Sequence, residues 1–121
     1  MPLMWKLRII TEVPKMPENK LRPVHPGEIL REEYLEPLGL SANELSLALR
    51  VPANRIGDIL KERRGITPNT ALRLARYFGT DAQSWLNLQS SYELKVAMNR
   101  DSEKIERDVR PMMAAAFAAY Q

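Results

Sequence analysis

A stretch near the middle of the chain carries polar side chains of the kinds that recognise DNA bases. Its apolar residues Ile56, Ile59 and Leu60 recur every three or four positions, which places them on the buried side of a helix. The residues left on the opposite side are Ala53, Asn54, Arg55, Asp58 and Lys61. Arginine can pair bidentately with guanine and asparagine with adenine, each pair being worth ~1 to 3 kcal/mol of discrimination, and alanine can meet a thymine methyl. We therefore expect the base-reading residues to be Ala53, Asn54, Arg55 and Asp58.

Residues suited to holding DNA phosphates surround this helix. They carry a positive charge, or they stand at the N-terminus of a predicted helix, where backbone N–H groups are free to meet an anion. Such contacts position a protein on DNA without specifying sequence. The expected phosphate-binding residues are Ser41, Asn43, Lys61, Arg63, Arg64, Thr67 and Asn69.

A predicted helix-turn-helix from Ser41 to Lys61 would position both the base-reading and the phosphate-binding residues. Ser41 to Glu44 forms a capping box, in which the serine side chain and the glutamate side chain each satisfy a backbone N–H of the other residue. The predicted buried stripe of this first helix is Leu45, Ala48 and Leu49. Val51 lies in the turn, and Pro52 fits the first turn of the second helix. In this motif the second helix enters the major groove of DNA.

Three further helices complete a predicted all-α domain. They are expected to span 26–36, 68–78 and 82–100, with Thr67 as the N-cap of the second and Asp81 as the N-cap of the third. Glycines at 39, 65 and 79 follow predicted helix ends. The expected inward side chains are Ile29, Leu30, Tyr34, Ala71, Leu74, Ala75, Phe78, Trp85, Leu88, Tyr92 and Val96.

The two ends of the chain lie outside this pattern. Residues 1–21 contain three prolines around a short apolar piece, which predicts a flexible N-terminal arm, and Met16 is a second possible start of the protein. We expect the domain to cover 22–100 and a C-terminal extension to cover 101–121. Glu103 to Arg110 fits either a short helix or an alternating strand. The apolar run Met112 to Tyr120 either frays or docks on a partner subunit as a dimer contact.

The composition fits one small globular domain in the cytoplasm. The chain has 121 residues, of which 45% are hydrophobic and 27% charged, with a net charge of +3. The positive charge gathers between Arg50 and Arg76, whereas Glu28 to Glu36 is acidic. The absence of cysteine excludes disulfides and thiolate metal sites. No apolar run approaches the roughly 18 residues of a membrane span.

No group of residues resembles a catalytic or metal site. His25 is the sole histidine, and no cysteine or suitably spaced acid supports it, so we expect it to help start the first helix. The glutamates between 28 and 36 form a plain acidic face. Phe78, Trp85 and Tyr92 have helical spacing, which favours core packing over stacking on bases. The sequence predicts a protein that is not an enzyme and needs no cofactor or metal.

Four segments in order resemble one known family. They are Arg22-Pro23-Val24-His25-Pro26-Gly27-Glu28-Ile29-Leu30, Glu36-Pro37-Leu38-Gly39-Leu40-Ser41, Gly65-Ile66-Thr67-Pro68 and Trp85-Leu86-Asn87-Leu88-Gln89. Together they look like the HigA antitoxin family, whose domain is a five-helix, lambda-repressor-like (XRE, HTH cro/C1-type) helix-turn-helix. The similarity covers about residues 22–96.

The resemblance implies the antitoxin of a type II toxin–antitoxin system. Such an antitoxin binds and neutralises a HigB-type toxin, an mRNA endonuclease, and represses its own operon by binding double-stranded operator DNA, usually as a homodimer. By position, the recognition helix of the family falls on Pro52 to Lys61. The alternatives are a stand-alone transcriptional repressor without a toxin partner and a protein-inhibitor module that does not bind DNA.

Overall fold

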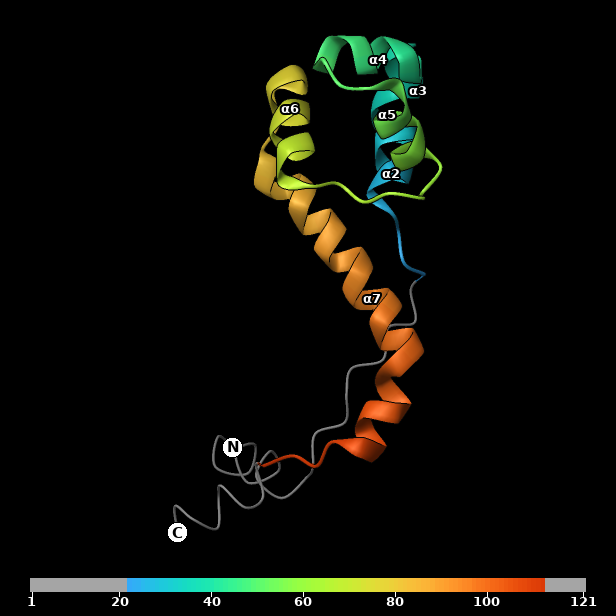
Figure 1. Ribbon diagram of the computed structural model, residues 1–121, viewed down its shortest axis with the longest axis vertical. Coiled ribbons are helices and arrows are strands. Elements are labelled where there is room, and N and C mark those ends of the chain that lie inside the picture. The colour runs from blue at the N-terminus through green and yellow to red at the C-terminus, as the bar shows by residue number, and fades with distance from the viewer. Residues whose placement is uncertain (1–21, 113–121) are drawn as a thin grey trace, which may run out of the picture. The chain divides into compact units, whose positions relative to one another are not determined.

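The structure, a computed structural model, describes residues 22–112, and within this range the chain forms five helices and no strand (Figure 1). The first is continuous through α2 (Pro26–Ile29), the π-helical turn η1 (Leu30–Leu35) and α3 (Glu36–Leu38). The others are α4 (Ala42–Leu49), α5 (Ala53–Leu60), α6 (Pro68–Phe78) and α7 (Ala82–Asp108). The predicted all-α class is confirmed. None of these described helices combines the length and the apolar run that crossing a membrane requires.

A single apolar core unites the helices of the compact unit that extends to Val96. Every described helix contributes to it, and Tyr34 and Phe78 pack on its edge with their ring centres 4.8 Å apart. Its fully or almost fully buried members are Leu30, Leu35, Leu45, Leu49, Ile56, Ile59, Ile66, Ala71, Leu74 and Trp85. The aromatic residues near the core therefore pack against protein, as their spacing predicts.

His25 starts the first helix, as expected. Its Nδ1 accepts a hydrogen bond of 2.9 Å from the backbone N–H of Gly27, so the imidazole acts as the N-cap of α2. The ring is buried and meets the Tyr92 ring edge-on, with 4.8 Å between the ring centres. This packing joins the start of the first helix to the middle of α7.

The first helix widens before it ends, which the sequence pattern does not predict. The backbone N–H of Glu36 donates to the carbonyl of Arg31, five residues back. Pro37 follows directly, and a proline ring inside a helix clashes with the carbonyl four residues earlier. A π-turn relaxes that clash. The chain then leaves the helix through Gly39, which has a left-handed φ of 66°.

Two details of the predicted helix-turn-helix are wrong. Ala48 is exposed, and the buried residue between Leu45 and Leu49 is Ser46, whose hydroxyl donates to the Ala42 carbonyl. The inward face of α4 thus consists of Ala42, Leu45, Ser46 and Leu49. The Ser46 hydroxyl can be buried because its hydrogen bond is made within the helix. Pro52 is the N-cap of α5 with an extended ψ of 143°, and so lies just before the first turn.

The prediction that the last helix ends near Arg100 is also wrong, because α7 continues to Asp108. Of the two alternatives for 103–110, the helix is correct up to that residue. No glycine or proline interrupts the chain between Ala82 and Asp108. An ion pair between Lys104 and Asp108, four residues apart, adds support to the helical conformation of this segment.

The predicted helix caps at Thr67 and Asp81 are confirmed. The predictions for residues 1–21 and 113–121 lie outside the described residues.

Gly27 allows a close backbone approach between the first helix and α5. A Cβ at this position would lie 1.9 Å from the carbonyl oxygen of Ile59, which is far inside van der Waals contact. Nearby, Arg31 Nη1 donates to the carbonyl of Leu60 at 2.7 Å. The C-terminal end of α5 is therefore held by both the backbone and a side chain of the first helix.

We predict that Gly27→Ala lowers the free energy of unfolding by about 3 kcal/mol, at the upper end of overpacking costs, because backbone atoms must move apart. Gly57→Ala on α5 is the matched control. A Cβ there has no atom within 4 Å, and alanine favours a helix, so stability should stay the same or rise by about 0.5 to 1 kcal/mol. Urea unfolding of both variants measures this. Equal stability of the two variants would contradict the close approach.

We predict that stability falls as the pH is lowered below neutrality because of His25. Burial lowers the pKa of this imidazole below its usual 6.5, against the opposing charge of Glu62. The unfolded chain therefore binds the proton at higher pH than the folded chain. The stabilisation is complete above pH 6.5 and is lost as the pH falls through the folded-state pKa, at up to about 1.4 kcal/mol per pH unit.

His25→Asn tests this assignment, because asparagine also accepts a hydrogen bond at an N-cap but does not titrate in this range. Between pH 7.5 and 5.5 the melting temperature of the wild type should fall more steeply than that of the variant. Parallel curves would exclude His25 as the titrating group.

Candidate nucleic-acid interface

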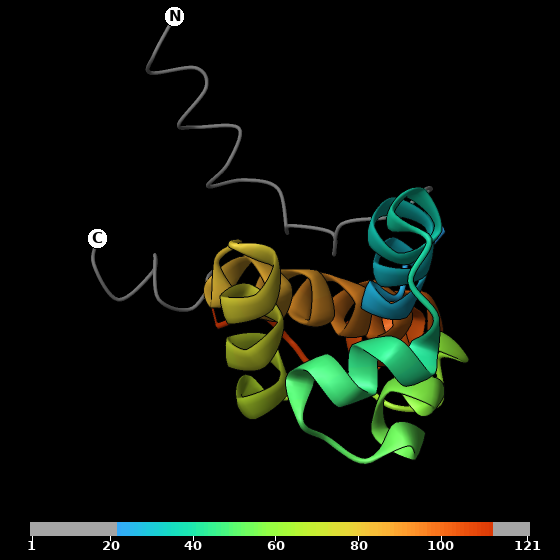
Figure 2. The ribbon, with the colours of Figure 1, turned by 90° about the horizontal axis from the view of Figure 1, so that it is seen from above.

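A tight turn between α4 and α5 sets the angle of the helix-turn-helix. Arg50 occupies the left-handed region with a φ of 59°, and its N–H bonds to the carbonyls of Ser46 and Leu47. The N–H of Val51 also reaches the Ser46 carbonyl, at 3.1 Å. α4 contacts α5 on one side and α6 on the other, and Figure 2 shows the three helices together. The turn thus fixes α5 beside a helix that is itself held on both sides.

The N-terminus of α5 is the open end of the motif. No side chain caps it, because its N-cap is a proline. Ala53 and Asn54 are exposed there, and Arg55 is half-buried. Backbone N–H groups at an uncapped helix start are available to an anion or to a base edge. Ile56 and Ile59 are fully buried, as predicted, whereas Leu60 is half-buried.

The structure brings two pairs of the predicted site residues together. Arg55 Nη1 donates to Asn69 Oδ1 at 3.2 Å, which links α5 to α6. Arg64 Nη2 lies 3.8 Å from Asp58 Oδ2, an ion pair at the surface that contributes little to stability. Asp58, a predicted base-reading residue, therefore forms an ion pair with a predicted phosphate-binding residue. Neither pairing was apparent from helical spacing.

The two predicted phosphate-binding residues at the start of α4 are exposed, and one of them, Ser41, is already hydrogen-bonded. Ser41 Oγ accepts from the N–H of Glu44 at 3.1 Å, and Glu44 Oε1 accepts from the N–H of Ser41 at 3.3 Å. The capping box predicted from the sequence is therefore present. The hydroxyl proton of Ser41 remains a possible donor. Asn43 is exposed on the same first turn.

The loop between α5 and α6 carries exposed basic side chains at Lys61, Arg63 and Arg64. It leaves α5 through Glu62, which has a left-handed φ of 62°. The loop is held from α7, because Gln89 Oε1 accepts from the N–H of Ile66 at 2.8 Å. Gly65 lies so close to Gln89 that an added Cβ would be 2.6 Å from its amide nitrogen.

Gln89 is thus a positioning residue that the sequence analysis did not assign. The only available signal was its place in a segment of family resemblance, since its partner is 23 residues away in the chain. Its amide nitrogen in turn donates to Glu93 at 3.0 Å. The basic loop is therefore fixed through a chain of polar contacts along α7.

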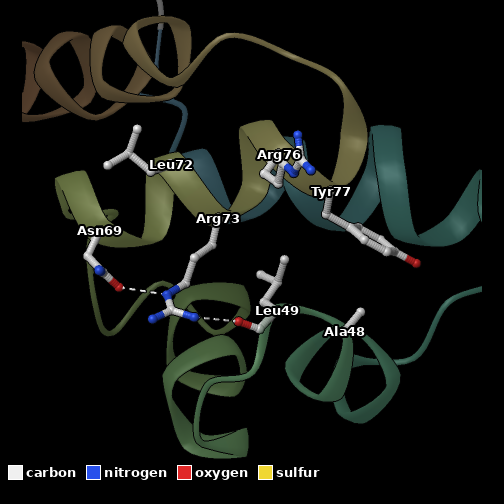
Figure 3. A pocket seen from close by; sticks show the side chains of 7 residues that line it. All are labelled: Ala48, Leu49, Asn69, Leu72, Arg73, Arg76 and Tyr77. Atoms are coloured by element: carbon white, nitrogen blue, oxygen red, sulfur yellow. Dashed lines mark hydrogen bonds between the residues drawn. The ribbon is translucent and has the colours of Figure 1, made fainter.

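A shallow pocket of about 540 Å³ lies between α4 and α6 (Figure 3). Arg73 lines this pocket. Its Nε donates a hydrogen bond to Asn69 Oδ1 at 2.9 Å, and its Nη1 donates one to the Leu49 carbonyl at 2.8 Å. Arg73 was not predicted from the sequence, although its spacing of four from Asn69 on one helix was a signal for this contact. The lining residues are Ala48, Leu49, Asn69, Leu72, Arg73, Arg76 and Tyr77.

The described residues do not assemble a metal site, since no group of three or more histidine or acidic side chains is suitably placed among residues 22–112. His25 is buried and its Nδ1 is occupied by Gly27. Glu28, the acid closest to it in sequence, is bound by both Nη atoms of Arg22, at 2.8 and 3.0 Å, which lowers the pKa of the Glu28 carboxyl.

Comparison with known proteins agrees with this geometry. A helix-turn-helix family model matches residues 32–85. Virulence-associated protein I of Dichelobacter nodosus is 59% identical over 88 residues, which cover 73% of this chain and 81% of that protein. The solved structure of an addiction module antidote protein of the HigA family from Coxiella burnetii has 49% identity and a TM-score of 0.72, covering 75% of this chain and 99% of that one. The chain belongs to the HigA family.

A second HigA structure contains DNA. Pseudomonas aeruginosa antitoxin HigA, solved with the higBA promoter, shares 48% identity and a TM-score of 0.73 with this HigA-family chain, covering 74% of it and 98% of the solved chain. The resemblance noted in the four sequence segments and the five-helix fold are both confirmed.

We predict that Gln89→Ala loosens the basic loop of this HigA-family protein. The N–H of Ile66 loses its acceptor in a partly buried place, which costs about 1 to 3 kcal/mol. Hydrogen exchange at Ile66 should accelerate, and the free energy of unfolding should fall. Gln83→Ala is the control on the same helix, because Gln83 Nε2 donates to the exposed side chain of Asn87. If Ile66 exchanges at the same rate in both variants, Gln89 does not hold the loop.

Proposed function

We propose that this HigA-family chain is the antitoxin of a type II toxin–antitoxin pair. It binds and neutralises a HigB-type mRNA endonuclease and represses its own operon through sequence-specific binding of double-stranded DNA. The observation that carries the proposal is the uncapped N-terminus of α5, with exposed Asn54 and half-buried Arg55, in a fold shared with a HigA solved with promoter DNA.

In this proposal the first turns of α5 read base edges in the major groove. Asn54 and Arg55 supply the amide and guanidinium groups that pair bidentately with adenine and guanine, and Ala53 meets a thymine methyl. Asp58 borders this surface and holds Arg64 nearby. The base-reading residues are therefore Ala53, Asn54, Arg55 and Asp58.

Phosphates on either side of the groove are held by a second set of residues. The loop after α5 contributes charge, and the starts of α4 and α6 contribute hydroxyl and amide groups together with the positive ends of their helix dipoles. These residues are all exposed: Ser41, Asn43, Lys61, Arg63, Arg64, Thr67 and Asn69.

The remaining parts of the proposal concern assembly. Residues 22–100 form the DNA-binding domain, between an N-terminal arm of residues 1–21 and an extension of residues 101–121 that contributes to a homodimer. The exposed apolar side chains of Ile105 and Val109 belong to this extension. The protein acts in the cytoplasm, carries no enzymatic activity of its own, and leaves catalysis to the toxin.

We predict that Arg55→Ala weakens binding to duplex DNA from the promoter of its own operon by ~1 to 3 kcal/mol and relaxes the preference at one base pair. Toxin neutralisation should change little. Gel shifts with the promoter duplex measure the affinity, and Arg76→Ala, which removes the same charge from an exposed position on α6, is the control. Unchanged affinity of Arg55→Ala would refute the base-reading assignment.

We predict that the neighbouring gene encodes a growth-arresting toxin that this chain counteracts. Expression of that gene alone should stop growth, co-expression with this chain should restore it, and pull-down should recover both proteins together. A harmless neighbour would contradict the antitoxin role. Promoter binding in that case would favour the alternative, a stand-alone transcriptional repressor.

A further inference from the structure

We propose that Asn69 and Arg73 of α6 are positioning residues for DNA recognition, because they fix the guanidinium of Arg55 before DNA arrives. This inference rests on the proposed function and adds two residues from a different helix to the base-reading apparatus. Asn69 Oδ1 accepts from Arg55 Nη1 at 3.2 Å and from Arg73 Nε at 2.9 Å. One carbonyl oxygen therefore joins a predicted reader to a second arginine.

Arg73 is anchored at its other end to the backbone. Its Nη1 donates to the carbonyl of Leu49 at 2.8 Å, the last residue of α4, and Figure 3 shows both of its hydrogen bonds. Leu49 itself is buried in the core. The contacts thus run from a buried backbone position on α4, through two side chains of α6, to Arg55 on α5. All three helices of the recognition surface are fixed relative to the guanidinium.

The cluster of Arg55, Asn69 and Arg73 carries two positive charges and no negative one, which favours binding of an anion. Two guanidinium groups share one neutral acceptor, and the ion pairs formed by the described residues include neither Arg55 nor Arg73. Like charges held together without a carboxylate repel each other, and the repulsion is relieved when a negatively charged ligand arrives. A nucleic-acid backbone beside the bases supplies that charge.

The donors that remain are sufficient for base reading. A guanidinium has five N–H groups, and Asn69 occupies one of those on Arg55, so two parallel donors stay available to a guanine. The amide nitrogen of Asn69 is still free to donate to a phosphate, in keeping with its proposed contact. An arginine held in place also loses less side-chain entropy when it binds.

The test compares two duplexes of equal length, one from the promoter of the protein's own operon and one of random sequence. Arg73→Lys keeps the charge but cannot span both acceptors with one planar group. We expect it to lower the ratio of promoter to random affinity about tenfold, the size of one good base contact, with an unchanged salt dependence. Asn69→Ala should lower this ratio similarly. Arg76→Lys, an exposed neighbour on α6, should leave it unchanged.

Two further measurements separate positioning from general destabilisation. In an Arg55→Ala background, Arg73→Lys should have little additional effect on the affinity ratio, because its effect passes through Arg55. In the free protein, nitrogen-15 relaxation of the Arg55 Nε–H should show an ordered side chain that becomes mobile in Asn69→Ala and Arg73→Lys. Thermal unfolding confirms that each variant is folded.

The outcomes distinguish the inference from the proposed function. If the wild type prefers the promoter duplex and Arg73→Lys prefers it equally, or if the losses from Arg55→Ala and Arg73→Lys add fully, the positioning role is overturned while the proposed function stands. If the wild type binds both duplexes equally, the proposed function fails and the inference fails with it.

Discussion

The structure depends on the contact between the first helix and the C-terminal end of α5. Helix α5 has only eight residues, too few to be stable in water by itself. It buries Ile56 and Ile59, and its last carbonyls meet the backbone at Gly27 and the guanidinium of Arg31. One end of α5 is thereby fixed inside the domain, whereas no side chain caps the N–H groups at its other end.

This arrangement explains how an open helix terminus is compatible with a stable fold. The N-terminus of α5 has no side-chain cap, and a good cap is worth about 1 kcal/mol. The starts of α4 and α6 do have caps, at Ser41 and Thr67. Stability comes from the neighbours of α5, and under the proposed function the N–H groups that lack a side-chain cap at its start serve recognition. The same division places the hydrogen-bonded cluster of Arg55, Asn69 and Arg73 at the surface.

Much of the fold could be predicted from sequence because it rests on local signals. Capping residues, glycines at helix ends and apolar spacing locate every described helix, and the outward position of Asn54 follows from two buried isoleucines. Two errors came from using apolar spacing alone, because other local features decide these positions. Ser46 is buried because its hydrogen bond is satisfied within α4, and α7 passes Arg100 because nothing in that segment breaks a helix. Contacts such as Ile66 with Gln89 join residues far apart in the chain, and spacing alone does not specify them.

The capping box at the start of α4 bears on the phosphate contact proposed there. The carboxylate of Glu44 already occupies the position in front of the Ser41 N–H that a phosphate would take. Binding a phosphate at this N–H is therefore an exchange of one anion for another, and its free energy is a difference between two similar attractions. The Glu44 carboxylate already offsets part of the positive potential of this helix start. Under the proposed function, contacts at this end therefore set the register of the protein on DNA more than they strengthen its binding.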